Sequence, residues 1–152
     1  MVNFKDNNEF EEFSGNAFFS GKNLTFVGFV ILMVCIAFAV KPEAGSEFNN
    51  LFLIAPVIGF FFLFGYQMNY FLVSGSKIII KNHYWWWRNI EYDLKDIQGV
   101  YIEERYKESK SLHINFKESN SRSFPAGSLR FENWQGLMQK FSSLGIATEK
   151  EF

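Results

Sequence analysis

Hydrophobic and polar positions divide this chain into three parts. Residues 24–40 and 51–73 form two runs without a charged residue, and period-two alternation begins after them. At about 1.5 Å per residue, a helix over the first run spans roughly 25 Å and one over the second roughly 35 Å, against a hydrocarbon core of about 30 Å. Because a small domain cannot surround two helices that are apolar on every side, the runs predict two transmembrane helices. We therefore expect an N-terminal segment at 1–23, a transmembrane hairpin at 24–73 and a C-terminal domain at 74–152.

The placement of lysine and arginine sets the expected orientation. The connection at 41–50 carries one Lys, whereas the opposite ends of the runs are flanked by Lys22, Lys77, Lys81 and Arg88. Since cytoplasmic flanks carry the excess of positive charge, we expect a multi-pass protein of the inner membrane with both termini cytoplasmic. The alternative of a cleaved secretory signal lacks the positive n-region, because the N-terminal segment holds more acids than lysines.

The N-terminal segment allows two interpretations. Phe10, Phe13 and Ala17 have the spacing of a short amphipathic helix on a membrane surface. Glu9, Glu11 and Glu12 would then face an anionic leaflet, which disfavours that arrangement. Partial disorder is the other interpretation.

Alternation of apolar and polar residues in the C-terminal part predicts short antiparallel strands. They cover residues 77–81, 84–88, 90–94, 100–102, 112–116 and 121–124, with turn residues between them. The spacing then becomes helical, and Gly145 follows the helix as a natural C-cap. The tail is therefore predicted as a small α+β domain, an antiparallel sheet or partial barrel closed by a C-terminal helix. The apolar stripe of that helix consists of Trp134, Leu137, Met138, Phe141 and Leu144.

Several segments follow one another in a recognisable order. They are a short strand at 77–80, an aromatic segment that ends at Arg88, a polar and apolar segment at 91–97, and the closing helix, all behind two apolar runs. In this order they resemble the small bacterial membrane proteins that carry two spans and a C-terminal PH-like domain. The resemblance covers roughly residues 69–144. It implies a PH-like barrel capped by a helix and tethered to a membrane, but it implies no reaction and transfers no ligand-binding residue.

Three consecutive tryptophans are the most unusual local feature. On a strand, Trp86 points to one side and Trp85 and Trp87 to the other, because successive side chains alternate. One set fills the domain, and the other lies under the helix, against a membrane or at a partner surface, where Trp is favoured. Nearby cations favour anionic headgroups. The candidate residues for a membrane or partner contact are Trp85, Trp86, Trp87, Lys77, Lys81 and Arg88.

Two polar residues lie near the inner end of the second run. Gln67 and Asn69 are candidates for an intramembrane polar contact. They either line a path for a substrate or make hydrogen bonds between helices and to headgroups. Because neither run holds an ionisable residue, the usual marker of an ion or proton relay is missing.

Composition excludes several classes of function. The 152 residues carry 15 Lys and Arg against 16 Asp and Glu, a near balance that argues against a nucleic-acid partner. The single Cys35 excludes an internal disulfide and a Cys-based zinc site, and His83 and His113 are too few for a metal site. No glycine-rich phosphate loop or hydrolase motif is present, and the adjacent Glu103 and Glu104 point to opposite faces of a strand. We therefore predict no catalytic, cofactor-binding or metal-binding residue.

These observations favour a binding or assembly module over an enzyme. We expect a membrane-anchored PH-like module that contacts a protein partner or lipid headgroups at the inner face of the membrane, or that forms a homo-oligomer. Its expected partners are membrane lipids and a protein, not a nucleic acid. The alternative is a component of a membrane transport or channel complex, whose path the polar end of the second run would line.

Overall fold

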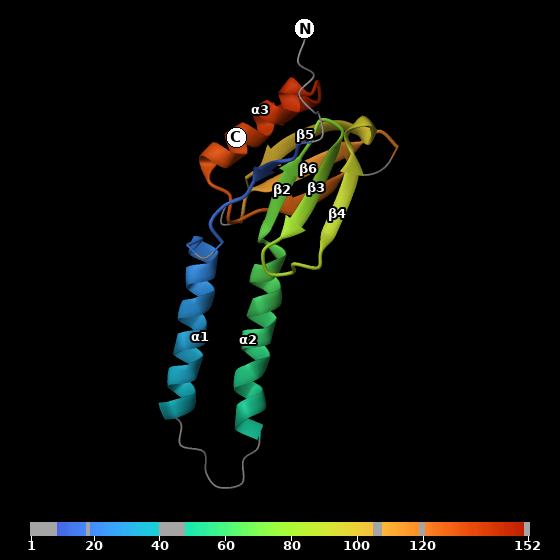
Figure 1. Ribbon diagram of the computed structural model, residues 1–152. Helices are drawn as coiled ribbons and strands as arrows, with labels where there is room; N and C mark the ends of the chain where they lie inside the picture. The colour runs from blue at the N-terminus through green and yellow to red at the C-terminus, as the bar shows by residue number, and fades with distance from the viewer. Residues whose placement is uncertain (1–8, 18, 40–47, 105–107, 119–120, 151–152) are drawn as a thin grey trace.

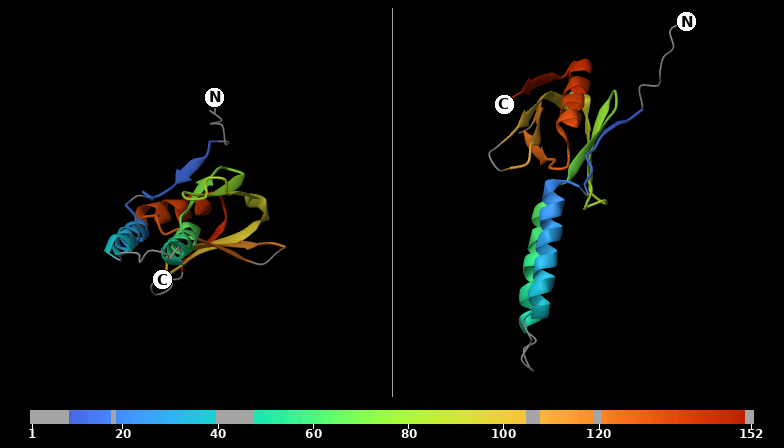
Figure 2. Two further views of the ribbon diagram at one scale, coloured as in Figure 1. Left: turned by 90° about the horizontal axis from the view of Figure 1, so that it is seen from below. Right: turned by 90° about the vertical axis from the view of Figure 1, so that its left-hand side faces the viewer.

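The computed structural model describes residues 9–17, 19–39, 48–104, 108–118 and 121–150. Two helices, α1 (Gly21–Ala39) and α2 (Phe48–Tyr66), lie side by side and project from one end of a β-rich domain (Figures 1 and 2). The chain enters the domain before α1 and returns to it directly after α2. The hairpin is therefore an insertion into the domain and not a segment that precedes it.

The first sheet is an antiparallel meander. It consists of β1 (Glu11–Phe13), β2 (Asn69–Val73), β3 (Lys77–Asn82) and β4 (Asn89–Asp93), in the order β1-β2-β3-β4. Alternate residues of β2 and β3 are buried, as the period of a half-buried strand requires. The inward set includes Phe71, Val73, Ile78 and Ile80.

The second sheet has the order β7-β6-β5-β8. A short 3-10 helix, η1 (Leu94–Asp96), leads from the first sheet into it. Its last strand pairs with β5 in parallel, because helix α3 (Phe131–Ser143) carries the chain back across the domain first. The strands are β5 (Ile97–Glu103), β6 (Ser111–Phe116), β7 (Arg122–Pro125) and β8 (Ala147–Lys150).

Helix α3 closes the core between the two sheets, as the apolar stripe predicts. Trp134, Leu137, Met138 and Phe141 are buried. Gly145 has a φ of 77°, in the left-handed region that ends many helices. The helix also covers β1, because a Cβ on Gly136 would lie 3.2 Å from the ring of Phe13.

The predicted strands are partly wrong. The strands form two separate four-stranded sheets that do not close into a barrel, and β8 was not expected. Residues 84–88, predicted as a strand, are a loop, because Asn82 Oδ1 accepts the backbone N–H groups of Tyr84 and Trp85 at 2.9 and 3.0 Å and turns the chain. The N-terminal segment contributes strand β1 instead of an amphipathic helix.

The predicted membrane hairpin is overturned as well. No helix within the described ranges is both long and apolar enough to cross a membrane. The second apolar run is divided between two elements: residues 51–66 are helical, roughly 24 Å at about 1.5 Å per residue, and β2 takes the rest. The two predicted transmembrane helices, and with them the multi-pass inner-membrane localisation with cytoplasmic termini, are therefore wrong. Of the predicted connection at 41–50, residues 48–50 belong to α2 and the others lie outside the described residues.

Aromatic rings hold the two helices together. The rings of Phe29 and Phe60 have centroids 4.2 Å apart, and Phe26 meets Phe61 and Phe64 at 6.3 and 6.1 Å. Pairs at these separations add to the free energy gained by burial. The internal seam of the hairpin is therefore made largely of Phe rings.

The role of α3 in the core predicts the effect of truncating Phe141, whose side chain is fully buried. Phe141→Ala should lower the free energy of unfolding by about 3–5 kcal/mol, because it removes a ring that the core cannot refill. Chemical denaturation followed by tryptophan fluorescence measures this. Phe131→Ala, on the exposed start of the same helix, is the matched control and should change stability little. Equal midpoints for the two variants would contradict the docking of α3.

Candidate functional site

Two buried amides join the hairpin to the domain. Asn69 at the start of β2 and Asn82 at the end of β3 face each other and are 1% and 2% exposed. Asn82 Nδ2 donates to Asn69 Oδ1 at 3.1 Å and to the carbonyl of Gly65 in α2 at 2.8 Å. Asn69 Nδ2 donates to the carbonyls of Tyr66 and of Pro125, at 3.1 and 2.7 Å. The end of α2 is thereby tied to both sheets.

Trp85 packs against the last turns of α2. Its ring lies 6.3 Å from the ring of Phe62 and 6.5 Å from that of Tyr66, and its Nε1 would lie 3.1 Å from a Cβ on Gly65. A larger residue at this position would require the indole to shift by a few tenths of an ångström. The guanidinium of Arg88 lies 5.6 Å from the Trp85 ring centroid and 5.9 Å from that of Tyr66.

Trp86 and Trp87 form an exposed pair of indoles in the loop after β3. They are 81% and 65% exposed, and their rings meet edge to face at 5.8 Å. The predicted alternation, with Trp85 and Trp87 on the same side, does not occur because the segment is a loop. Two adjacent exposed indoles beside the hairpin are a candidate contact surface.

The predicted cations do not gather around these rings. Lys77 stands at the start of β3 and pairs with the carboxylate of Glu91, which raises the pKa of Lys77 above its ordinary value through hydrogen bonding and charge. Lys81 lies four residues further along β3, roughly 13 Å away at about 3.3 Å per residue. Arg88 is held over Trp85, so the three cations form no single headgroup site.

Gln67 and Asn69 both bond to the β domain. Gln67 Oε1 accepts a hydrogen bond from Ser109 Oγ at 2.8 Å, and its backbone carbonyl accepts one from the N–H of Gly127 at 2.7 Å. Neither residue belongs to a helix, since α2 ends at Tyr66. Their contacts explain why two polar side chains interrupt the apolar run: they satisfy backbone and hydroxyl groups where helix becomes strand.

The outward faces of the hairpin carry most of the exposed large apolar side chains of the described chain. Its large apolar residues are between 39% and 64% exposed. These residues belong to the two uncharged runs that the pattern predicted as transmembrane helices. The set consists of Leu24, Val27, Ile31, Leu32, Val34 and Ile36 on α1, and of Ile54, Ile58, Phe62, Leu63 and Tyr66 on α2.

A small cavity of about 190 Å³ lies beside His83, between the domain and the start of α1. The imidazole stacks on the Tyr70 ring at 4.5 Å, and its Nε2 is buried without a hydrogen-bond partner among the described residues. Burial lowers the pKa of His83 below its ordinary value, and the carboxylate of Glu12 opposes that shift weakly. The histidine is therefore neutral at pH 7.

A second histidine belongs to a row of polar residues across the second sheet. His113 Nε2 lies 2.6 Å from Glu103 Oε2 and 3.1 Å from Ser123 Oγ. A serine nucleophile needs the hydroxyl on one ring nitrogen and the carboxylate on the other. Because both contacts use the same nitrogen, the row lacks the geometry of a catalytic triad. Glu104 faces the other way and pairs with Lys110 at 2.7 Å.

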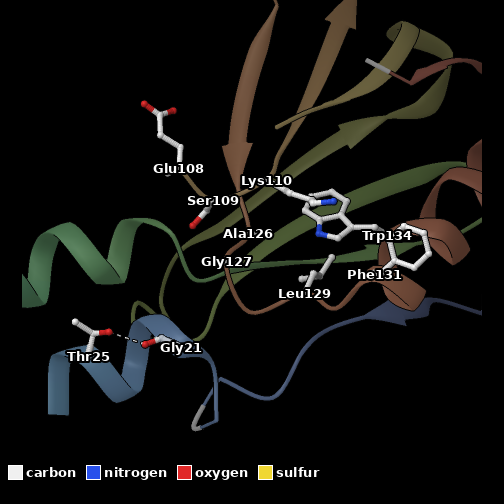
Figure 3. Close-up of a pocket in the computed structure, with 10 residues that line it drawn as sticks. All are labelled: Gly21, Thr25, Glu108, Ser109, Lys110, Ala126, Gly127, Leu129, Phe131 and Trp134. Atoms are coloured by element: carbon white, nitrogen blue, oxygen red, sulfur yellow. Dashed lines mark hydrogen bonds between the residues drawn. The ribbon is translucent and has the colours of Figure 1, made fainter. Parts of the chain in front are cut away.

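A groove of about 520 Å³ lies between the first turn of α1 and the start of α3 (Figure 3). Its walls are mixed, with Leu129, Phe131 and Trp134 on one side and the loop at 108–110 on another. Lys110, the cation of this lining, is paired with Glu104 and lies 5.8 Å from the Phe131 ring centroid. Its charge is therefore already compensated, and the groove favours no particular ligand.

Comparison with known proteins adds no assignment to this geometry. No protein-family model and no curated protein matches the chain. The resemblance to two-span proteins with a PH-like domain remains a prediction. The hairpin surface and the exposed Trp86 and Trp87 are therefore the candidate site on physical grounds alone.

The amide junction generates a stability prediction. Asn82→Ala should cost about 1–3 kcal/mol, because it leaves the buried Asn69 Oδ1 without its donor and removes the acceptor of two backbone N–H groups in the next loop. Denaturant unfolding of the full chain measures it. Asn89→Ala, an exposed position a few residues along the chain, is the control and should stay within about 0.5 kcal/mol of the parent. Equal free energies of unfolding for the two variants would contradict a dependence of the junction on the amide pair.

The half-buried His83 generates a pH prediction. Because the pKa of His83 is lowered on folding, the unfolded chain binds a proton near pH 6.5 while the folded chain binds it only at lower pH. Folding stability should therefore decrease as the pH falls below about 6.5. His83→Phe, which keeps a ring against Tyr70, should show a smaller loss of melting temperature between pH 7 and pH 5. Identical pH profiles for the two proteins would contradict this role of His83.

Proposed function

We propose that the chain is an assembly module whose α1–α2 hairpin docks against apolar helices of a protein partner. The exposed hairpin surface is the observation that carries this proposal. Roughly half of each of these residues is uncovered, so the outward faces together expose an apolar area on the order of 1,000 Å², whereas one contiguous apolar patch on a monomeric protein rarely exceeds a few hundred Å². A surface of this size favours a binding role over one that is purely structural.

The domain holds the hairpin from both ends, which suits presentation to a partner. Before α1, the backbone of Gly15 packs so closely on that of Ser128 that a Cβ would lie 1.6 Å from its carbonyl oxygen. Glu11 pairs with Lys140 of α3 at 2.9 Å. A preorganised element loses less conformational entropy on binding, so more of the burial energy remains as affinity.

The start of α1 is also stabilised locally. Ser20 Oγ accepts a hydrogen bond from the N–H of Asn23 at 3.2 Å, as an N-cap residue does. The hydroxyl of Tyr84 donates to Asn23 Oδ1 and connects this turn to the loop that carries the tryptophans. Both helices therefore begin or end on residues that the domain binds directly.

Trp86 and Trp87 extend the same surface toward the domain. Trp85, the residue before them in the chain, packs on Phe62 and Tyr66 of α2, so the exposed indole pair follows directly after a residue bound to the hairpin. Tryptophan and arginine are enriched among the residues that dominate binding energy at protein interfaces. This composition supports a protein partner at the junction.

Site-specific photo-crosslinking in producing cells tests the proposal. A benzoylphenylalanine at Ile31 or Ile58, on the outward faces of α1 and α2, should give a discrete adduct with one identifiable protein. The same probe at Phe131, which is equally exposed but lies on α3, is the control and should give none. Adducts with lipid alone, or equal labelling at all three positions, would contradict an assembly role for the hairpin.

A further inference from the structure

The loop between β3 and β4 lies at the end of the domain from which the two helices project (Figure 1). His83 begins this loop and is bound to the domain by two contacts. Its imidazole stacks on the Tyr70 ring of β2 at 4.5 Å, and its backbone N–H donates to the carbonyl of Met68 at 3.0 Å. Its Nε2 is buried without a hydrogen-bond partner among the described residues. A buried polar atom of this kind is uncommon and calls for an explanation.

The next residue, Tyr84, contacts both helices of the hairpin. Its hydroxyl donates to Asn23 Oδ1 of α1, and its ring meets those of Phe26 and Phe61 edge to face at 6.5 and 5.4 Å. Because His83 and Tyr84 are adjacent in the chain, a displacement of the imidazole from β2 also displaces the side chain that holds the start of α1.

A cavity gives the imidazole room to move. It measures about 190 Å³ and is lined by Ala17, Asn23, His83 and Tyr84, so it lies between the domain and the first turn of α1. At about 30 Å³ per molecule, this space accommodates several waters. Water therefore reaches the ring once the ring tilts from Tyr70, and neither sheet has to unfold.

The groups around the imidazole offer a proton little compensation. Tyr70 and Tyr84 are phenols whose pKa values are raised by burial, so both stay neutral below pH 7. Asn23 of α1 is uncharged, and Lys81, opposite Tyr70 in the register of β2 and β3, is a cation. The carboxylate of Glu12 on β1 favours the protonated ring, but burial has the larger effect and lowers the pKa of the imidazole.

We propose that this junction is a pH-sensitive hinge, in which a proton on His83 displaces the loop at 83–85 and loosens the hairpin from the domain. As a control of the hairpin surface the inference rests on the proposed function, although the movement itself needs no partner. In the closed form the imidazolium is half-buried and its Nε2 has no partner among the described residues, whereas water solvates it in the open form.

The hairpin tilts in the open form but stays attached to the domain. Asn69 binds the carbonyl of Tyr66 at the end of α2 and that of Pro125 on the second sheet, and neither contact involves the loop. The end of α2 therefore acts as the pivot, and the start of α1, which Tyr84 releases, is the part that moves.

The direction of the change with pH follows from proton linkage. In the open form the imidazole regains an ordinary pKa of about 6.5, whereas burial lowers the pKa in the closed form. The open form therefore binds the proton at a higher pH than the closed form does. The ratio of open to closed chains should rise by up to about tenfold for each pH unit below about 6.5, until the pKa of the closed form is passed.

The distance between two spin labels measures the tilt. The single Cys35 is exposed on α1, roughly 18 Å along the helix from Asn23 at about 1.5 Å per residue. Its partner label is placed by Gln98→Cys, an exposed position on β5. Double electron–electron resonance on the full chain should show one distance at pH 7.5 and a second, shifted population at pH 5. Circular dichroism should be the same at both pH values, because the sheets stay folded.

Three variants assign the response to one histidine. His83→Phe keeps a ring on Tyr70 but takes up no proton, so the second population at pH 5 should be lost. His83→Gln, also uncharged at both pH values, repeats the test with a smaller side chain in case the phenylalanine disturbs the fold. His113→Gln replaces the other histidine of the chain and should respond as the parent does.

The outcomes separate the hinge from the function on which it rests. A single population at both pH values, a second population that persists in both His83 variants, or its loss in His113→Gln would overturn the hinge. A fall in the circular dichroism signal in step with the second population would overturn it too, since the chain would then unfold as a whole. The photo-crosslinks at Ile31 and Ile58, made at pH 7.5 with the hinge closed, test the assembly function independently.

Discussion

The buried pair of amides at Asn69 and Asn82 is the constraint on which the arrangement of this protein depends. A helix that ends inside a protein leaves carbonyl groups that need donors. Here the donors are the two side-chain amides, which reach the carbonyls of Gly65 and Tyr66 and, through Asn69, that of Pro125 in the other sheet. The direction of the hairpin is therefore determined by a polar network that is almost completely buried.

The same network determines the loop that carries the tryptophans. Asn82 Oδ1 accepts two backbone N–H groups of that loop, so one side chain ends strand β3, binds α2 and turns the chain. The Trp85 ring then packs against Gly65 of α2, and the side chains of Trp86 and Trp87 remain exposed to solvent. The exposed aromatic pair follows from the junction and not from the alternation of a strand.

The hairpin separates two kinds of packing. Phenylalanine rings fill the seam between α1 and α2, whereas mostly aliphatic side chains and two open glycines, with Phe62 and Tyr66, lie on the outward faces. Exposed apolar surface lowers solubility and favours association. Because the seam already stabilises the helices against each other, the outward faces remain available for a contact between molecules, and the β domain keeps them in place.

Part of the fold follows directly from local pattern. The apolar stripe from Trp134 to Phe141 predicted a helix that closes the core. Its helical spacing was sufficient to identify the helix, because only one face of the helix is buried. Alternation likewise located most strands of the second half. The sequence also showed that the chain is rich in uncharged apolar runs and that it lacks the motifs of common enzymes. The helix and the strands depend on residues only a few positions apart, so the spacing of apolar residues is enough to predict them.

Only the tertiary structure decided where the second apolar run stops being helical. Residues 51–73 read as one helix because apolar residues suit both a helix and a buried strand. The pairing of β2 with β1 and β3, and the amides of Asn69 and Asn82, divide the run after Tyr66. Strand β1 could not be found from its own sequence either, because its partner lies more than fifty residues away across the hairpin. Long-range pairing supplies the free energy that local preference leaves undecided, and for this reason the sequence alone could not place the site.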